Sequence, residues 1–174
     1  MAAAGKFALP DPVAWKQIWN NPGHPMEHVQ VILMDGDRWR VEERELSSSK
    51  IFVLIFDGTT FVSTNPKVTT KPVGSGPVMQ ASLSFLNGIK PLGTETRDGR
   101  SCLLFEMPPD AQSAKSRMWV DSQSHFPVVL DAWSPQGALT EMHFQLLKSD
   151  FSILSPKCFD IHNTAPMLTP LLTL

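Results

Sequence analysis

The sequence predicts an α+β fold: a curled antiparallel β-sheet of about ten strands, forming a barrel or half-barrel, with two short helices. Two observations lead to this prediction. Short apolar runs with a period of two recur along the chain and are separated by Asp-Gly and Asn-Pro turns. Strands do not alternate with long helices, which disfavours a parallel sheet.

The first 25 residues are a proline-rich lead-in that is predicted to hold the first short helix. Prolines stand at positions 10, 12, 22 and 25. Asp11 is a suitable N-cap with Pro12 at the first helical position. Trp15, Ile18 and Trp19 then fall on one helical face. We therefore expect a short helix in this segment.

A four-stranded meander is expected next, with strands at 27–34, 37–45, 50–56 and 59–64. Asp35-Gly36 and Asp57-Gly58 are typical two-residue hairpin turns, and Asn65-Pro66 ends the fourth strand. Residues 65–77, with three Pro and two Gly, are expected to be a loop. The second helix is expected at 78–86, where Asn87-Gly88 is a good C-terminal stop.

Six further strands are expected at 92–96, 101–107, 115–121, 126–134, 138–148 and 158–161. Asp98-Gly99 and Pro135-Gln136-Gly137 supply turns between them. No internal repeat or linker divides the chain. Residues 1–174 are therefore expected to form a single domain, which agrees with the usual domain size of about 100–200 residues.

The distribution of apolar residues over the two strand faces bears most directly on function. A sheet covered on one side alternates apolar and polar residues, but the strand at 50–56 is apolar on both faces. The strands at 101–107 and 126–133 repeat this pattern. Because two helices are too few to cover ten strands, we expect the sheet to curl around an apolar interior. That interior is either a ligand cavity or an ordinary closed core.

Composition and charge exclude several classes of function. The 174 residues are 42% hydrophobic and 18% charged, and the formal net charge of −2 gives no electrostatic basis for binding nucleic acid. The longest apolar run, residues 51–56, is far shorter than the roughly 18 residues of a membrane-spanning helix. The N-terminal residues lack the apolar stretch of a signal peptide. The protein is therefore either cytoplasmic or begins after a removed signal.

Two pairs of residues are candidates for binding a metal ion. His24 and His28, like Cys158 and His162, have a spacing that occurs in zinc sites. Pro25, however, prevents the helix that would bring the two histidines together. We therefore expect surface or core histidines, and neither a metal site nor a cofactor.

Nucleophilic catalysis has no better support. The sequence has no Gly-x-Ser-x-Gly motif, and Gly74-Ser75-Gly76 lacks the Lys-Ser/Thr of a phosphate-binding loop. Cys102 and Cys158 form either one disulfide or two buried thiols, and their spacing does not decide between these. We therefore expect that the protein is not an enzyme.

Charges of both signs alternate along the strand at 37–45, at Arg38, Arg40, Glu42, Glu43, Arg44 and Glu45. One interpretation is a solvated outer face with cross-strand ion pairs. The other places an arginine at the rim of a cavity, where it would hold a carbonyl or an acidic head group.

The order of these elements resembles the LolA-like family of periplasmic lipoprotein carriers. The resemblance extends over roughly residues 27–161 and rests on strand and turn patterns. The matching segments are Asp37-Arg38-Trp39-Arg40-Val41-Glu42, Ile55-Phe56-Asp57-Gly58-Thr59, Asn65-Pro66, Met118-Trp119-Val120-Asp121, Phe126-Pro127, residues 128–131, Pro135-Gln136-Gly137 and Phe151-Ser152-Ile153 with Pro156 and Phe159.

This resemblance implies an incomplete antiparallel barrel with an apolar lining, helices that act as a lid, export to the periplasm and binding of acyl chains. In such an oxidising compartment the two cysteines would be able to pair. One departure from the family is the N-terminal helix, normally long, which Pro22 and Pro25 cut short here.

We therefore expect a monomeric, non-enzymatic protein of the bacterial envelope that binds or transports the acyl chains of a lipid or lipoprotein. The alternative is a protein-interaction or envelope-sensor domain whose partners are envelope membrane proteins. A continuous cavity of several hundred Å³ would favour the carrier. The residues expected to line the cavity are Trp39, Phe52, Leu54, Phe56, Leu104, Trp119 and Trp133, with Arg40 at the rim.

Overall fold

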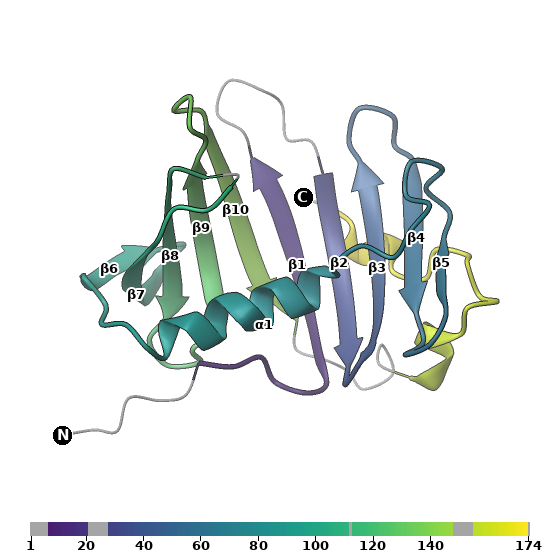
Figure 1. The fold of residues 1–174 in the computed structure, drawn as a ribbon. Helices are drawn as coiled ribbons and strands as arrows, with labels where there is room; N and C mark the ends of the chain where they lie inside the picture. Colours follow the sequence, from purple (N-terminus) through teal and green to yellow (C-terminus); the bar gives the residue numbers. More distant parts are fainter. Residues whose placement is uncertain (1–6, 21–27, 112, 148–154, 174) are drawn as a thin grey trace.

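The computed structural model describes residues 7–20, 28–111, 113–147 and 155–173. Within them, ten strands form one antiparallel sheet in the order β5-β4-β3-β2-β1-β10-β9-β8-β7-β6 (Figure 1). The edge strands β5 and β6 do not pair with each other, so the sheet is unclosed. The strands are β1 (Val13–Asn20), β2 (His28–Asp35), β3 (Arg38–Glu45), β4 (Ile51–Phe56), β5 (Phe61–Ser63), β6 (Gly93–Arg97), β7 (Arg100–Met107), β8 (Lys115–Asp121), β9 (Pro127–Trp133) and β10 (Leu139–Leu146).

The sheet consists of two meanders, β1–β5 and β6–β10, which are joined where β1 pairs with β10. Consecutive strands within each meander pair with one another. At three of the hairpin turns, Gly36, Gly58 and Gly99 have φ values of 57°, 100° and 72°, a region in which glycine is favoured. The predicted Asp-Gly turns are confirmed at these positions.

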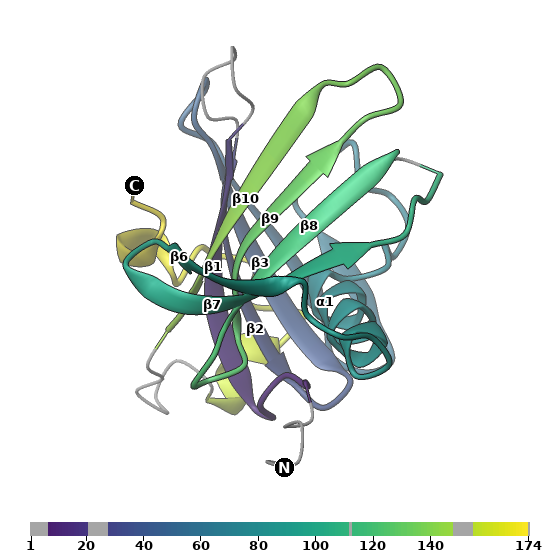
Figure 2. The same cartoon turned by 90° about the vertical axis from the view of Figure 1, so that its left-hand side faces the viewer.

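The α-helix α1 (Ser75–Leu86) crosses the concave face of the sheet (Figures 1 and 2). Met79, Leu83 and Leu86 recur at helical spacing and are buried against the sheet. Asn87 caps the C-terminal end and ties it to Phe7: the Phe7 N–H donates to Asn87 Oδ1 at 2.7 Å, and Asn87 Nδ2 donates to the Phe7 carbonyl at 2.9 Å. The predicted second helix is confirmed and begins three residues earlier than expected, at Ser75. No helix among the described residues has the length and apolar character needed to cross a membrane.

The short helix predicted in the N-terminal lead-in is wrong, because residues 13–20 form β1 at the centre of the sheet. Trp15 and Trp19 face α1 and Ile18 faces the opposite side, as strand alternation requires. Both faces of β1 are covered, so apolar residues occur on both and hide the period of two. A strand here also satisfies the backbone groups of β2 and β10, which a helix would leave without partners.

The strand predicted at 158–161 is also wrong. The described C-terminal segment, residues 155–173, contains the short 3₁₀ helices η1 (Pro156–Phe159) and η2 (Thr169–Leu171) instead. Figure 2 shows the sheet between α1 on one side and this segment on the other. Its buried residues pack against the convex face in a cluster made of Ala14, Val29, Val31, Leu33, Cys158, Phe159, Leu168 and Leu172. The two-sided apolar pattern therefore has a second cause besides curvature: irregular chain covers the convex face.

Candidate ligand-binding groove

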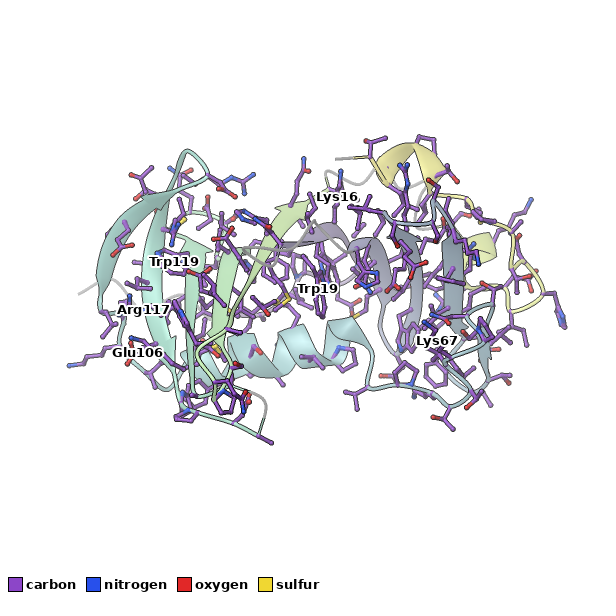
Figure 3. All side chains as sticks on the ribbon, turned by 90° about the horizontal axis from the view of Figure 1, so that it is seen from above. Lys16, Trp19, Lys67, Glu106, Arg117 and Trp119 are labelled. Carbon is purple, nitrogen blue, oxygen red and sulfur yellow. The ribbon has the colours of Figure 1, made fainter. Side chains whose placement is uncertain are left out.

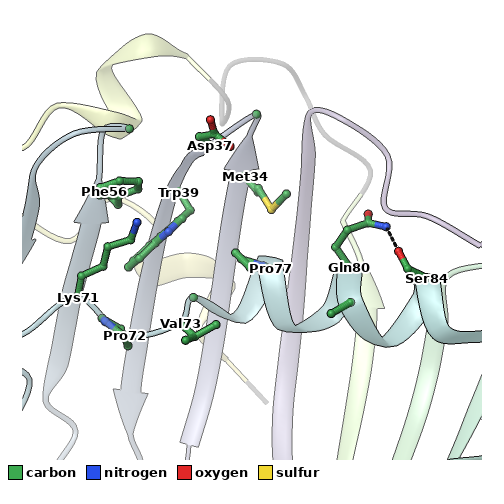
Figure 4. Close-up of a pocket in the computed structure, with 14 residues that line it drawn as sticks. Met34, Asp37, Trp39, Phe56, Lys71, Pro72, Val73, Pro77, Gln80 and Ser84 are labelled. Atoms are coloured by element: carbon green, nitrogen blue, oxygen red, sulfur yellow. Dashed lines mark hydrogen bonds between the residues drawn. The ribbon is translucent and has the colours of Figure 1, made fainter.

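A groove of about 840 Å³ lies on the concave face, beside the N-terminal half of α1. Its walls come from the ends of β2, β3 and β4 near their hairpin turns, from the segment that precedes α1, and from the first turns of α1 (Figure 4). The lining residues are Met34, Gly36, Asp37, Trp39, Phe56, Gly58, Lys71, Pro72, Val73, Gly74, Pro77, Gln80, Ala81 and Ser84. Aliphatic and aromatic side chains predominate, with one lysine and one aspartate among them.

Aromatic rings form the strand wall of this groove. The Trp39 ring centroid lies 6.0 Å from that of Phe56 and 5.9 Å from that of Phe61, distances typical of stabilising aromatic pairs. The Lys71 Nζ atom lies 3.4 Å from the centroid of the Phe56 ring (Figure 4). The lysine therefore places a cation directly over an aromatic wall.

Two glycines allow α1 to approach this wall closely. A Cβ atom on Gly74 would lie 3.0 Å from Cε2 and Nε1 of the Trp39 indole, and one on Gly76 would overlap the Met34 sulfur. Gly74 is the N-cap of α1 and Gly76 is its second residue. Residues 74–76, which were predicted to belong to a loop, therefore begin the helix. Their two glycines let the helix lie close to the strand wall of the groove.

A second groove, of about 300 Å³, lies on the concave face between α1 and strands of the sheet. Its lining is mostly apolar and comes from α1, β1, β8, β9 and β10; the residues are Gln17, Trp19, Val73, Val78, Met79, Ser82, Met118, Leu130, Met142 and Phe144. Seen from above (Figure 3), Trp19 lies between the sheet and α1. Val73 lines both grooves, so both border the segment that precedes the helix.

Polar side chains cross β1, β2 and β3 near the second groove. Gln17 Nε2 donates to Gln30 Oε1 at 2.6 Å, and Gln30 Nε2 donates in turn to Glu43. His28 Nδ1 lies 3.4 Å from Glu43 Oε1. The concave face therefore changes from an aromatic surface at the groove of 840 Å³ to a hydrogen-bonded polar surface at the opposite ends of these strands.

The structure divides the eight residues predicted to line a cavity between the two faces of the sheet. Trp39 and Phe56 line the larger groove, and Phe52 and Leu54 belong to the same concave cluster. Arg40, Leu104, Trp119 and Trp133 lie on the convex face. Neighbouring side chains of a strand point to opposite faces of a sheet. An error of one position in a strand therefore moves a predicted residue to the other face.

Arg40 is fully buried on the convex face, so both sequence interpretations of the alternating charges are wrong at this position. Its Nη2 lies 2.7 Å from Glu42 Oε1, and neither side chain is exposed to solvent. The predicted solvated face was based on charge alternation alone. The C-terminal segment, whose sequence has no periodic pattern, covers this part of β3 and excludes water.

Trp119 and Leu104 pack together on the convex face of the second meander. The Trp119 Nε1 atom donates to Glu95 Oε2 at 2.9 Å, and the Arg97 guanidinium lies 4.1 Å from the Trp119 ring centroid. These contacts give Trp119 a structural role far from the groove. Trp133 also lies on the convex face, and the Lys115 Nζ atom lies 5.7 Å from the centroid of its ring.

The prediction missed the groove residues that are not on strands. Lys71, Pro72, Val73 and Pro77 belong to the segment before α1 and to its first turn. No period of two marks such residues, and their place over the sheet depends on where α1 packs. The excess of Pro and Gly at 65–77 was the available signal.

A cluster of titratable groups lies on the convex face, away from both grooves. His143 Nδ1 is 2.8 Å from Asp98 Oδ2, and His143 Nε2 is 2.7 Å from Glu141 Oε1. Burial by itself would lower the pKa of His143, but the hydrogen bonds to Asp98 and Glu141 outweigh it and raise that pKa. Burial, and then the charge of Glu141, raises the pKa of Asp131. Across the described residues, no three His, Cys, Asp or Glu side chains are arranged to hold a metal ion.

The cysteines do not form the disulfide that was one of the two predicted alternatives. Cys102 and Cys158 are both buried thiols, and they belong to separate apolar clusters on the convex face. Burial is the largest influence on the Cys102 thiol and raises its pKa.

The fold and the groove together define a class of protein: an unclosed, curled antiparallel sheet with a helix lying across an apolar concave face. No protein-family model and no curated protein matches the sequence. Among solved structures, a Pseudomonas aeruginosa MucA/MucB complex aligns with 84% of this chain at 15% identity and a TM-score of 0.52. A second structure, of MucB in complex with MucA(peri), aligns with 78% at 16% identity and a TM-score of 0.49.

The chain spans about half of those two matched chains, 56% and 49% of their lengths. A LolA superfamily protein from Nitrosomonas europaea aligns with 87% of this chain and 94% of its own length, at 14% identity and a TM-score of 0.36. The alignment with the MucA/MucB complex, at a TM-score of 0.52, shows that this chain shares its fold with a solved structure.

Proposed function

We propose that the concave groove binds the acyl chain of a lipid or lipoprotein, and that the protein is a non-enzymatic binding or carrier protein of the bacterial periplasm. The observation that carries this proposal is the groove of about 840 Å³ with its aromatic wall of Trp39 and Phe56. Its volume falls within the range of about 300–1,000 Å³ that is usual for small-molecule sites. A closed core would leave no such space.

Elementary energetics supports an acyl chain as ligand. Each buried methylene contributes about 0.8 kcal/mol, and a Kd of about 1 μM corresponds to about 8 kcal/mol. A chain with roughly ten buried methylenes therefore reaches micromolar affinity without a strong polar contact. Burial of an acyl chain in an apolar groove is therefore enough for micromolar binding by a carrier protein.

The test is saturable binding of a fluorescent fatty-acid probe, measured with variants on the two faces of the sheet. Trp39→Ala and Phe56→Asp should weaken probe binding by about ten-fold or more, because they remove the aromatic wall or place a charge in it. Trp133→Ala is the matched control on the convex face and should leave binding unchanged. Circular dichroism checks that each variant folds.

Two results would contradict the proposal. One is the absence of saturable binding to the wild-type protein. The other is an equal loss of binding in Trp39→Ala and Trp133→Ala, since these two tryptophans lie on opposite faces. If Phe56→Asp fails to fold, the comparison of the two tryptophan variants decides the question.

The second candidate is a protein-interaction or sensor domain in the envelope. The specific observation is that the matched MucB structures are complexes with MucA, and that the edge strand β6 of this chain is largely exposed. An exposed edge presents unpaired backbone groups to an incoming strand. A partner bound in this way should be released by a proline at Thr94 or Thr96, whereas an acyl probe in the groove should not be.

A further inference from the structure

Exposed apolar side chains concentrate around α1. Among the described residues five large hydrophobic side chains are exposed, and four of them lie between residues 73 and 92. They are Val73 at 78%, Leu92 at 62%, Val78 at 51% and Phe85 at 41%. Val78 and Phe85 are seven residues apart, two helical turns, and therefore share the outer side of α1. We call these four residues the lid face.

The charges in the segment of sequence that contains the lid face are all positive. From Gly58 to Thr94 the sequence contains no Asp or Glu, whereas it contains Lys67, Lys71 and Lys90, in a chain whose net charge is −2. All three lysines are exposed. Figure 3 places Lys67 on the same side of the sheet as α1, with Lys16 on the other side.

The helix α1 has no charged residue at all. A helix whose outer side faces only water normally carries charged residues there. Exposed valine, phenylalanine and leucine flanked by lysines are instead the composition of segments that lie in the interface of an anionic membrane.

We propose that the lid face rests on the surface of an anionic lipid bilayer. Val78, Phe85 and Leu92 contact the acyl boundary, and the flanking lysines contact the phosphates of the head groups. Charge complementarity selects this partner, because an uncharged apolar face whose segment, residues 58–94, contains three lysines and no Asp or Glu fits a negative surface. A protein with an acidic, apolar docking site is the competing partner, and the experiment below separates the two.

The position of the grooves adds a consequence, which rests on the function proposed above. Val73 lines both grooves and Val78 lines the smaller one. The grooves thus open at the side of the molecule that contacts lipid. An acyl chain would pass between bilayer and groove along the lid face with little exposure to water.

The experiment is co-sedimentation of the protein with vesicles of phosphatidylcholine, with or without phosphatidylglycerol. The wild-type protein should bind the anionic vesicles and should be released by salt. Phe85→Ser and Leu92→Ser should each weaken this binding several-fold. Lys67→Gln and Lys90→Gln should each weaken it by roughly five-fold, the factor that corresponds to about 1 kcal/mol for each lysine near the surface.

Two matched controls lie on the opposite side of the sheet. Met167 is 41% exposed, as is Phe85, and its backbone N–H is bound to Glu42 on the convex face. Met167→Ser and Lys157→Gln should leave vesicle binding unchanged. Equal binding to neutral and anionic vesicles, binding to neither, or an equal loss in the controls would overturn the proposal.

Probe binding in buffer without vesicles separates this proposal from the proposed function. Phe85 and Leu92 line neither groove, so their serine variants should bind the fatty-acid probe as the wild type does. Normal probe binding without vesicle binding by the wild-type protein overturns the membrane contact and leaves the carrier function standing. Vesicle binding by the wild-type protein without probe binding overturns the carrier function and leaves the membrane contact standing.

Discussion

Arg40 and Glu42 form an ion pair that is fully shielded from solvent and that fixes the C-terminal segment to the sheet. Arg40 Nε donates to Glu42 Oε1 at 2.8 Å. Arg40 also donates to the carbonyls of Asn163 and Ala165, at 2.9 and 2.6 Å. The Glu42 carboxylate accepts the N–H groups of Met167 and Leu168, each at 2.8 Å. Two side chains of one strand thus hold a segment that lies 118 to 126 residues away in sequence.

This arrangement predicts a large loss of stability when one partner is removed. Arg40→Ala or Glu42→Ala should lower the free energy of unfolding by about 3–5 kcal/mol, because each leaves an unpaired buried charge. Urea unfolding measures the change. Glu106→Ala, which removes a surface ion pair with Lys115 and Arg117, should cost less than about 1 kcal/mol. Similar losses in the buried and surface variants would contradict the assigned role.

Lys71 is predicted to contact the anionic head group of a bound fatty acid, because its ammonium stands over the aromatic wall of the groove. Lys71→Gln should weaken binding of a fatty acid by up to about five-fold, the limit for an exposed ion pair. Binding of the fatty alcohol of equal length should hardly change. Competition against the fluorescent probe measures both affinities. Lys50→Gln, at an exposed lysine outside the groove, is the control, and equal losses for acid and alcohol would show that the charge plays no part.

His143 predicts a dependence of stability on pH. Its pKa in the folded protein is raised above the ordinary value of 6.5 by Asp98 and Glu141. The folded state therefore holds the proton more tightly, so this stabilisation is fully present below pH 6.5 and is lost as the pH rises through the raised pKa. Urea unfolding at about pH 6 and about pH 9 should show the decrease, and His143→Gln should reduce it. An unchanged pH dependence in that variant would exclude His143 as its source.

The thiols of Cys102 and Cys158 are predicted to be reduced and protected. Both side chains are buried, and burial raises the pKa of Cys102, which lowers its thiolate fraction. Thiol titration without reductant should detect both groups after denaturation and react with them slowly in the native protein. Detection of no thiol in the denatured protein would reveal a disulfide and contradict the structure.

Much of the fold was predictable because hairpin chemistry is local. The Asp57 carboxylate accepts hydrogen bonds from the N–H groups of Thr59 and Thr60, at 2.8 and 2.7 Å, and Gly58 supplies the positive φ. These requirements lie within a few residues of sequence, so the strands on either side were placed within a few residues of their ends. Helix α1 was predictable for the same reason, from its apolar spacing and its Asn87-Gly88 stop.

Half of the predicted site was misplaced because strand parity is not local. In β4, Phe56 lines the groove whereas its neighbour Ile55 is buried on the other face. Both residues are large and apolar, so the sequence contains nothing that distinguishes them. The same ambiguity placed Trp119 and Trp133 in the predicted cavity although they lie on the convex face.

The sequence by itself determined the hairpins and an antiparallel sheet with apolar residues on both of its faces, because turn residues and apolar patterns act over short distances. The tertiary structure alone decided which side holds the groove. That choice depends on α1 packing against Trp39 at Gly74 and against Met34 at Gly76, and on the C-terminal segment packing against Arg40 and Glu42 from the opposite side. Both are contacts between segments far apart in the chain, and a covering layer without regular secondary structure leaves no periodic signal in the sequence. The physical character of each face was therefore set by what covers it.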